Sequence, residues 1–103
     1  MRFLIKARPS IDLVNQHIKE GTFDQRMQRV LSELKPEATY FLEEEGRRTC
    51  IMIVEMQQTS EIPKYGEPFF HMGAEVFIHP VMTPEDLAKL NVAELGKKWG
   101  GGA

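Results

Sequence analysis

The sequence predicts an α+β fold in which an antiparallel β-sheet carries helices on one face. Two observations lead to this prediction. Segments with strand character and segments with helical periodicity follow one another in the order β-α-β-β-α-β, with a further helix at the C-terminus. Residues 48–56 read RTCIMIVEM, an apolar run that does not alternate with polar residues. A strand with one solvated face would alternate, so this run predicts a central strand buried on both faces.

The composition is that of a single globular domain. The chain has 103 residues, of which 42% are hydrophobic and 27% are charged. We expect residues 1–82 to form the α+β unit and residues 83–103 to add a C-terminal helix and a glycine-rich tail to the same domain. A net charge of −2 without a basic run argues against nucleic acid as a partner. No stretch approaches the roughly 20 apolar residues that span a bilayer, so no membrane partner is expected.

The first half of the chain predicts two strands around a helical segment. Residues 2–8 have strand character and end at Pro9. Residues 11–34 carry an apolar stripe at helical spacing that Gly21 interrupts, so they form either one kinked helix or two helices in succession. Residues 38–43 predict the second strand, and the turn at residues 44–47 predicts a hairpin into the central strand.

The second half predicts a helix, a strand and a final helix. Residues 62–70 should hold a short, interrupted helix, because two prolines and a glycine fall within them. Residues 75–81 have strand character. Thr83 is a favourable N-cap, and we expect one helix from there through Trp99, closed by the glycines at 100–102.

This order is the ferredoxin-like plan, which places the first and third strands in the middle of the sheet. Side-chain alternation then sorts the strand residues onto two faces. The expected dry core consists of Phe3, Ile5, Ala7, Cys50, Met52, Val54, Met56, Val76 and Ile78. The other face mixes apolar and charged residues, namely Lys6, Arg8, Ile51, Ile53, Glu55, Glu75, Phe77 and His79. Such a face is either a ligand pocket or a polar dimer interface.

A homodimer is the expected assembly. The helices available cover only one face of the sheet, and the other face would expose several hundred Å² of apolar surface in a monomer. A second copy of the chain, related by twofold symmetry, would cover it. The single cysteine, Cys50, allows no internal disulfide, which makes the cytoplasm the default location.

Three segments resemble the dimeric α+β barrel superfamily, and in particular its muconolactone isomerase-like members. They are MRFLIK at residues 1–6, EPFFHMGAEV at residues 67–76 and HPVMT at residues 79–83. The resemblance extends over residues 1–85 and implies ferredoxin-like subunits that pair sheet to sheet. It also implies a cofactor-independent isomerase, or a related proton-transfer enzyme, acting on a small lactone or an aromatic-derived acid. No catalytic residue carries over from the family.

Candidate catalytic residues are Glu55 and His79. A carboxylate near the end of a buried strand, or an imidazole beside aromatic residues, suits proton transfer. The structural alternatives are a solvated Glu55, or one that forms an ion pair with Lys6 or Arg8, and a surface or capping position for His79. Candidate ligand-binding residues are Lys6, Arg8, Tyr40, His71 and Phe77.

The remaining chemistry is sparse. The histidines lack metal-ligand spacing and there is no phosphate loop, so we expect neither a metal nor a cofactor. Cys50 is expected to act as a small apolar residue, and His17 as a solvated helical residue. The sequence favours a non-catalytic homodimer that either binds a small organic ligand, such as an organic acid, in a pocket between sheet and helices or packs against a partner protein. The isomerase is the alternative.

Overall fold

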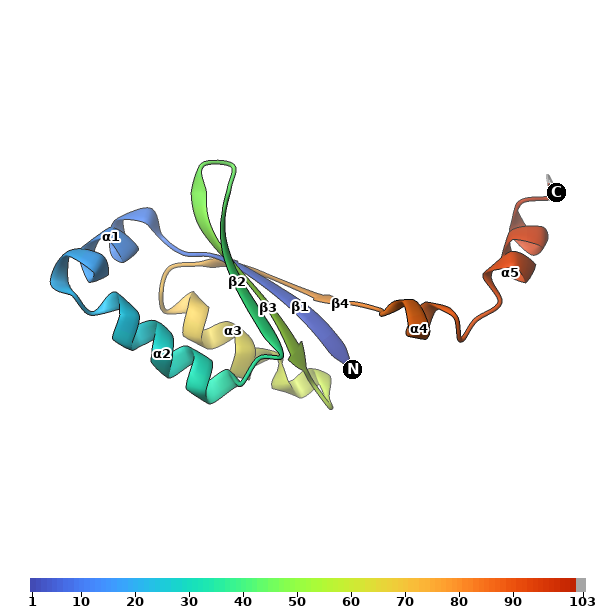
Figure 1. The fold of residues 1–103 in the computed structure, drawn as a ribbon, viewed down its shortest axis with the longest axis horizontal. Coiled ribbons are helices and arrows are strands. Elements are labelled where there is room, and N and C mark those ends of the chain that lie inside the picture. The colour runs from blue at the N-terminus through green and yellow to red at the C-terminus, as the bar shows by residue number, and fades with distance from the viewer. Residues whose placement is uncertain (102–103) are drawn as a thin grey trace.

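The computed structural model describes residues 1–101, which form a four-stranded antiparallel sheet and a layer of helices (Figure 1). The predicted α+β fold on the ferredoxin-like plan is confirmed. The elements are β1 (Arg2–Arg8), α1 (Ile11–Glu20), α2 (Phe23–Leu34), β2 (Ala38–Glu44), β3 (Arg47–Glu55), a 3-10 turn (Thr59–Glu61), α3 (Ile62–Phe70), β4 (Glu75–Pro80), α4 (Pro84–Leu87) and α5 (Val92–Trp99).

The strand order is β2-β3-β1-β4, so the first and third strands lie in the middle, as predicted. β1 pairs with β3 on one side and with β4 on the other. β2 and β3 are joined by a two-residue turn at Glu45 and Gly46, whose φ values of 55° and 79° are those of a type I′ hairpin. The predicted hairpin is therefore present.

The predicted division of the sheet into two faces is also present. Helices α1, α2 and α3 lie against one face, and its central residues Phe3, Ile5, Ala7, Cys50, Met52 and Val54 are buried beneath them. Ile5 and Met52, partners across β1 and β3, are both fully buried. The opposite face, which we call the open face, has no element of residues 1–80 packed on it (Figure 1).

In the helical layer, the structure decides one alternative that the sequence left open and differs from two predictions, those for His17 and for helix α3. Residues 11–34 form two helices, because Gly21 ends α1 in the left-handed conformation (φ 76°). His17, expected to be solvated, is only 7% exposed, so that prediction was wrong. The backbone N–H of Thr22 donates to the His17 carbonyl at 2.9 Å, which folds the turn between the helices over this part of α1. Helix α3 runs through Pro68 without interruption.

The C-terminal segment is two helices rather than one. Thr83 caps α4, and its hydroxyl accepts from the Asp86 N–H at 3.1 Å. A second cap follows at Asn91, whose side chain accepts from the Glu94 N–H at 3.1 Å and starts α5. α5 ends at Trp99 as predicted, with Gly100 as its cap, whereas Gly102 of the predicted tail lies outside the described residues.

Residues 81–101, called here the C-terminal arm, project away from the rest of the chain on the open-face side of the sheet (Figure 1). The radius of gyration is 17.9 Å, whereas a compact domain of this length has about 13 Å. Every residue of α5 is exposed. No helix within residues 1–101 has the length and apolar character needed to cross a membrane.

Candidate functional site

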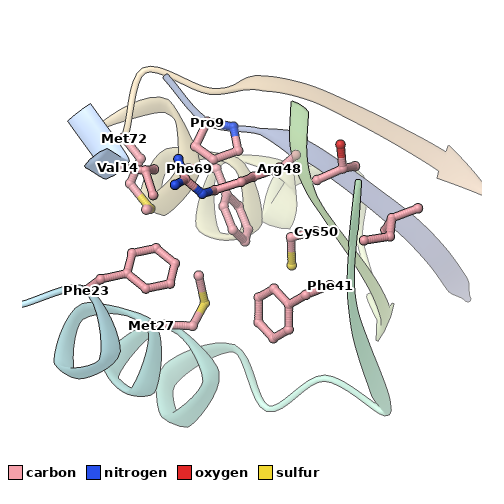
Figure 2. A pocket seen from close by; sticks show the side chains of 12 residues that line it. Pro9, Val14, Phe23, Met27, Phe41, Arg48, Cys50, Phe69 and Met72 are labelled. Atoms are coloured by element: carbon pink, nitrogen blue, oxygen red, sulfur yellow. The ribbon is translucent and has the colours of Figure 1, made fainter. Parts of the chain in front are cut away.

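A cavity of about 360 Å³ lies between the sheet and the helices, near the hairpin end of β2 and β3 (Figure 2). This volume falls within the range of small-molecule sites, about 300–1,000 Å³. The cavity is lined by Ala7, Pro9, Val14, Phe23, Met27, Phe41, Leu42, Arg48, Thr49, Cys50, Phe69 and Met72. Most of these side chains are apolar, so the cavity suits a ligand with a hydrophobic body.

Helix α2 and the β2–β3 ladder form two facing walls. Phe23 and Met27 are four residues apart and share one face of α2. Phe41 pairs with Cys50 across the ladder, so both point to the same side of the sheet. Figure 2 shows the Phe23 and Met27 side chains on α2 directed across the cavity toward Phe41 and Cys50. Aromatic rings on opposite walls are suited to hold a flat ligand between them.

Arg48 is the only charged residue among those that line the cavity. It lies two positions before Cys50 on β3 and therefore points to the same face, beyond the end of the dry core. Its side chain extends along one side of the cavity in Figure 2. A guanidinium beside an apolar cavity is a ready partner for a carboxylate or another planar anion.

The remaining polar groups of the lining are neutral. Burial raises the pKa of the Cys50 thiol to about 11, so the sulfur is protonated at neutral pH and is a poor nucleophile. The Thr49 hydroxyl donates to the Arg47 carbonyl at 3.3 Å. The lining holds no aspartate, glutamate or histidine. Among the residues that line the cavity, no side chain is therefore suited to act as a general base.

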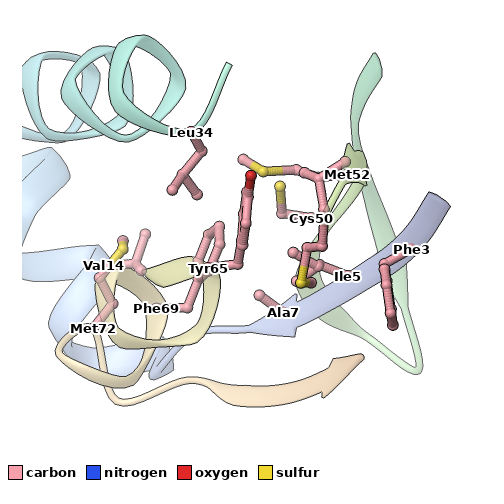
Figure 3. Close-up of a cluster of buried hydrophobic side chains, with 12 residues drawn as sticks. Phe3, Ile5, Ala7, Val14, Leu34, Cys50, Met52, Tyr65, Phe69 and Met72 are labelled. Carbon is pink, nitrogen blue, oxygen red and sulfur yellow. The ribbon is translucent and has the colours of Figure 1, made fainter. Parts of the chain in front are cut away.

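The inner side of the cavity belongs to the buried core. Val14, Phe69 and Met72 border the cavity and also belong to the cluster of buried side chains in Figure 3. Phe69 is 2% exposed and Val14 is fully buried. Because close-packed interiors resist rearrangement, this side of the cavity is preformed.

The open face carries an ion-pair cluster at the same end of the sheet. Lys6 Nζ donates to Glu44 Oε1 at 3.0 Å, and Arg8 donates to the same oxygen. A further ion pair joins Arg8 to Glu45 at 3.6 Å. Hydrogen bonds from Lys6, which has the larger effect, and from Arg8 lower the pKa of Glu44, so this carboxylate stays ionised. Both predicted anion-binding cations therefore already have a carboxylate partner.

The other predicted residues of this face are spread along it. Lys6 Nζ lies 5.3 Å from the centre of the Phe77 ring, a cation–π contact. Tyr40 is 65% exposed on the edge strand β2. Glu55 lies at the far end of β3, where it forms an ion pair with the N-terminal amino group of Met1.

His79 and Glu55 are not in contact. His79 lies on β4 opposite Leu4, whereas Glu55 lies on β3 opposite Arg2, and β1 separates the two strands. Glu55 therefore takes its ion pair from the chain terminus rather than from the lysine or arginine considered from the sequence.

His71, the last predicted ligand residue, lies outside both regions. Its side chain is 82% exposed at the end of α3, where its Nε2 lies 3.3 Å from a carboxylate oxygen of Glu67. Both residues border a second pocket, of about 790 Å³, among α1, α2 and α3. Within residues 1–101, no three histidine, cysteine or acidic side chains form a group that could hold a metal ion.

Of the site residues predicted from the sequence, the structure brings Lys6, Arg8 and Phe77 together on the open face. None of the predicted site residues lines the cavity. The residue that the sequence predictions missed is Arg48. Its signal was present, because strand alternation from Cys50 places it on the helix-covered face. What alternation does not show is that α2 stands off from the sheet at this point.

The fold defines this chain as a ferredoxin-like α+β protein with a cavity under its helices. Among solved structures, it is similar to 5-chloro-2-hydroxyhydroquinone dehydrochlorinase (TftG) from Burkholderia phenoliruptrix AC1100 in complex with 2,5-dihydroxybenzoquinone. The TM-score is 0.63 at 16% sequence identity, over 82% of this chain and 97% of that chain. At this identity the likeness shows a shared fold. No protein-family model matches the sequence, and no curated protein matches it.

Proposed function

We propose that this protein binds a small, flat organic acid in the cavity between the sheet and the helices. The observation that carries the proposal is an apolar cavity of about 360 Å³ with a single charged residue, Arg48, in its lining. The hydrophobic walls would take the body of the ligand, and the guanidinium would pair with its acidic group. The structurally similar dehydrochlorinase was solved with 2,5-dihydroxybenzoquinone, a small oxygen-bearing ring, which is compatible with this class of ligand.

The residues that line the cavity support ligand binding without catalysis. Proton transfer needs a group that gains or loses a proton near neutral pH. The cavity offers a guanidinium, a hydroxyl and a thiol whose pKa is raised to about 11. None of these three groups is an effective base at neutral pH.

The test is a calorimetric titration of benzoate, its neutral analogue benzamide, and 2,5-dihydroxybenzoquinone into the native protein and two variants. Arg48→Met removes the guanidinium from the cavity. Arg29→Met removes a matched exposed arginine that borders the second pocket, of about 790 Å³, instead. A hydrogen bond to a charged group contributes about 1.5–3 kcal/mol, so Arg48→Met should weaken benzoate binding by roughly tenfold or more.

Arg29→Met should leave the affinity for benzoate unchanged, and benzamide should bind the native protein about as weakly as benzoate binds Arg48→Met. If Arg29→Met abolished benzoate binding, or if benzoate bound Arg48→Met as tightly as it bound Arg29→Met, the cavity would not be the site.

A second candidate function is a cofactor-independent isomerase or a related proton-transfer enzyme with Glu55 and His79 as its acid–base groups. The structural likeness to an enzyme favours it. Its site would be the open face, and a second subunit would have to enclose that face. Turnover of a lactone that is lost in both Glu55→Gln and His79→Gln, but kept in Arg48→Met, would establish this alternative. Equal turnover in all three variants would exclude these two residues.

A further inference from the structure

The second pocket, of about 790 Å³, lies among α1, α2 and α3, the three helices that form the helical layer in Figure 1. The proposed function makes no use of it, and it has only Met72 in common with the cavity beneath the helices. Each helix lines it with residues at helical spacing, such as Leu13 and His17 on α1. Its volume also falls within the range of small-molecule sites.

The apolar part of this pocket is aliphatic. It consists of Leu13, Val30, Leu34, Pro63, Pro68 and Met72, and none of the residues that line the pocket within residues 1–101 is a phenylalanine, tyrosine or tryptophan. The cavity beneath the helices differs, because phenylalanine rings stand on its walls. Aromatic walls suit a flat ring, whereas aliphatic walls suit a flexible hydrocarbon chain.

Three cations stand beside these aliphatic residues. Arg26, Arg29 and Lys64 line the pocket, and none of them forms an ion pair with a carboxylate within residues 1–101. Arg26 Nε donates to the Thr22 hydroxyl at 3.3 Å, and Lys64 Nζ lies 5.2 Å from the centre of the Tyr65 ring. Cations without a carboxylate partner are available to the anionic group of a ligand.

Two carboxylates, Glu33 and Glu67, also line the pocket, so the cations outnumber them by one. A carboxylate oxygen of Glu67 lies 3.3 Å from His71 Nε2 on the same side of α3. The whole chain carries a net charge of −2. The pocket is therefore a local excess of positive charge on an acidic protein, which favours an anionic ligand over a cationic one.

His17 is the buried polar residue of this pocket. It is 7% exposed, and its Nδ1 is buried without a hydrogen-bond partner within residues 1–101. An N–H at Nδ1 would have no acceptor, so the favoured neutral tautomer carries its hydrogen on Nε2. A buried nitrogen without a partner costs stability that an apolar side chain of similar size would not cost. A histidine at this position is therefore explained by a hydrogen bond from Nε2 to a ligand rather than by folding.

We propose that this pocket is a second ligand site, which binds a molecule with an aliphatic chain and an anionic head group. The chain would lie against the leucine, valine and proline side chains. The head group, a carboxylate or a phosphate, would pair with the arginines of α2 and with Lys64, and it would accept a hydrogen bond from His17 Nε2. The site does not depend on the proposed function, because neither Arg48 nor the aromatic cavity takes part in it.

The test is a calorimetric titration of octyl phosphate, octanoate and neutral 1-octanol into the full-length protein. Octyl phosphate and octanoate share the chain and differ in the head group, so together they show which head the site prefers. Both should bind, and 1-octanol should bind at least about tenfold more weakly, because hydrogen bonds between charged groups are the stronger ones.

Two lysine variants locate the site. Lys64→Met keeps the aliphatic stem and removes the charge, so it should weaken octyl phosphate binding about fivefold or more. Lys19→Met is the matched control, since Lys19 is an exposed lysine of α1 that does not line the pocket. It should leave the affinity unchanged.

His17→Leu separates a binding role of this residue from a structural one. It should weaken octyl phosphate binding, while the midpoint of urea unfolding stays the same or rises, because leucine leaves no nitrogen unpaired. A lower midpoint with an unchanged affinity would overturn the part of His17 in the site. Lys64→Met decides the test if His17→Leu does not fold.

Three results would overturn the inference: neither octyl anion binds at millimolar concentration, 1-octanol binds as tightly as octyl phosphate, or Lys64→Met binds octyl phosphate as the native protein does. Displacement of octyl phosphate by benzoate would also overturn it, because the two ligands would then share one site. Octyl phosphate that binds when benzoate does not would support this inference and contradict the proposed function.

Discussion

Raising the pH above 9 should destabilise this protein in a way that depends on Cys50. The ordinary thiol pKa of 9.0 rises to about 11 in the folded chain because the sulfur is buried. Between these two values the unfolded chain loses the thiol proton and the folded chain keeps it. Stability that is fully present below pH 9 is therefore lost as the pH rises through 11.

A pKa difference of two units between the folded and unfolded chain corresponds to about 2.7 kcal/mol in the free energy of unfolding. About 2 kcal/mol of this should be lost between about pH 8 and pH 10.5. The assay is urea unfolding at both pH values for the native protein and for Cys50→Ala. Lysines and tyrosines also titrate in this range, but they are common to the two proteins. The difference between the two pH dependences therefore isolates Cys50. Identical pH dependences would mean that the thiol is hydrated, and that the cavity wall is not as dry as the structure shows.

Three further predictions concern the core, the thiol and the open face. Met52→Ala, at a fully buried position, should lower the free energy of unfolding by about 2–5 kcal/mol, whereas Met82→Ala, at 70% exposure, should change it by less than about 0.5 kcal/mol in urea titrations. Iodoacetamide should alkylate Cys50 at neutral pH at least about tenfold more slowly than a free thiol, since a hundredfold lower thiolate fraction outweighs the higher reactivity of a more basic thiolate. The pKa of Glu44 is lowered by Lys6 and Arg8, so acid should destabilise the native protein more than Glu44→Gln as the pH falls through the range below 4.5, and Glu33→Gln should behave like the native protein.

The part of the fold that could be predicted from the sequence is the part that depends on the alternation of side chains along the strands. The unbroken run at residues 50–54 indicated a central strand, and the structure places it between β1 and β2. The same alternation put Ile5 and Met52 in the core, where both are fully buried. These features depend only on local backbone geometry, which the sequence pattern reports directly.

The features that escaped prediction depend on how elements pack against one another. Arg48 lines the cavity because α2 stands off from the end of the β2–β3 ladder, and no local pattern encodes that spacing. His17 is buried because the turn after α1 folds back over it. The split of the C-terminal helix was visible in principle, since Asn91 is a strong N-cap residue, but the apolar periodicity on both sides of it favoured one continuous helix.

We propose that the cavity beneath the helices, rather than the open face, binds the ligand. Amide chemical-shift mapping during a titration with benzoate distinguishes the two places, because each face of the sheet has its own reporters. If the cavity is the site, amide shifts should saturate together at Phe41, Arg48 and Phe69, while Lys6 and Phe77 stay unchanged. Saturating shifts confined to Lys6 and Phe77 would place the ligand on the open face instead.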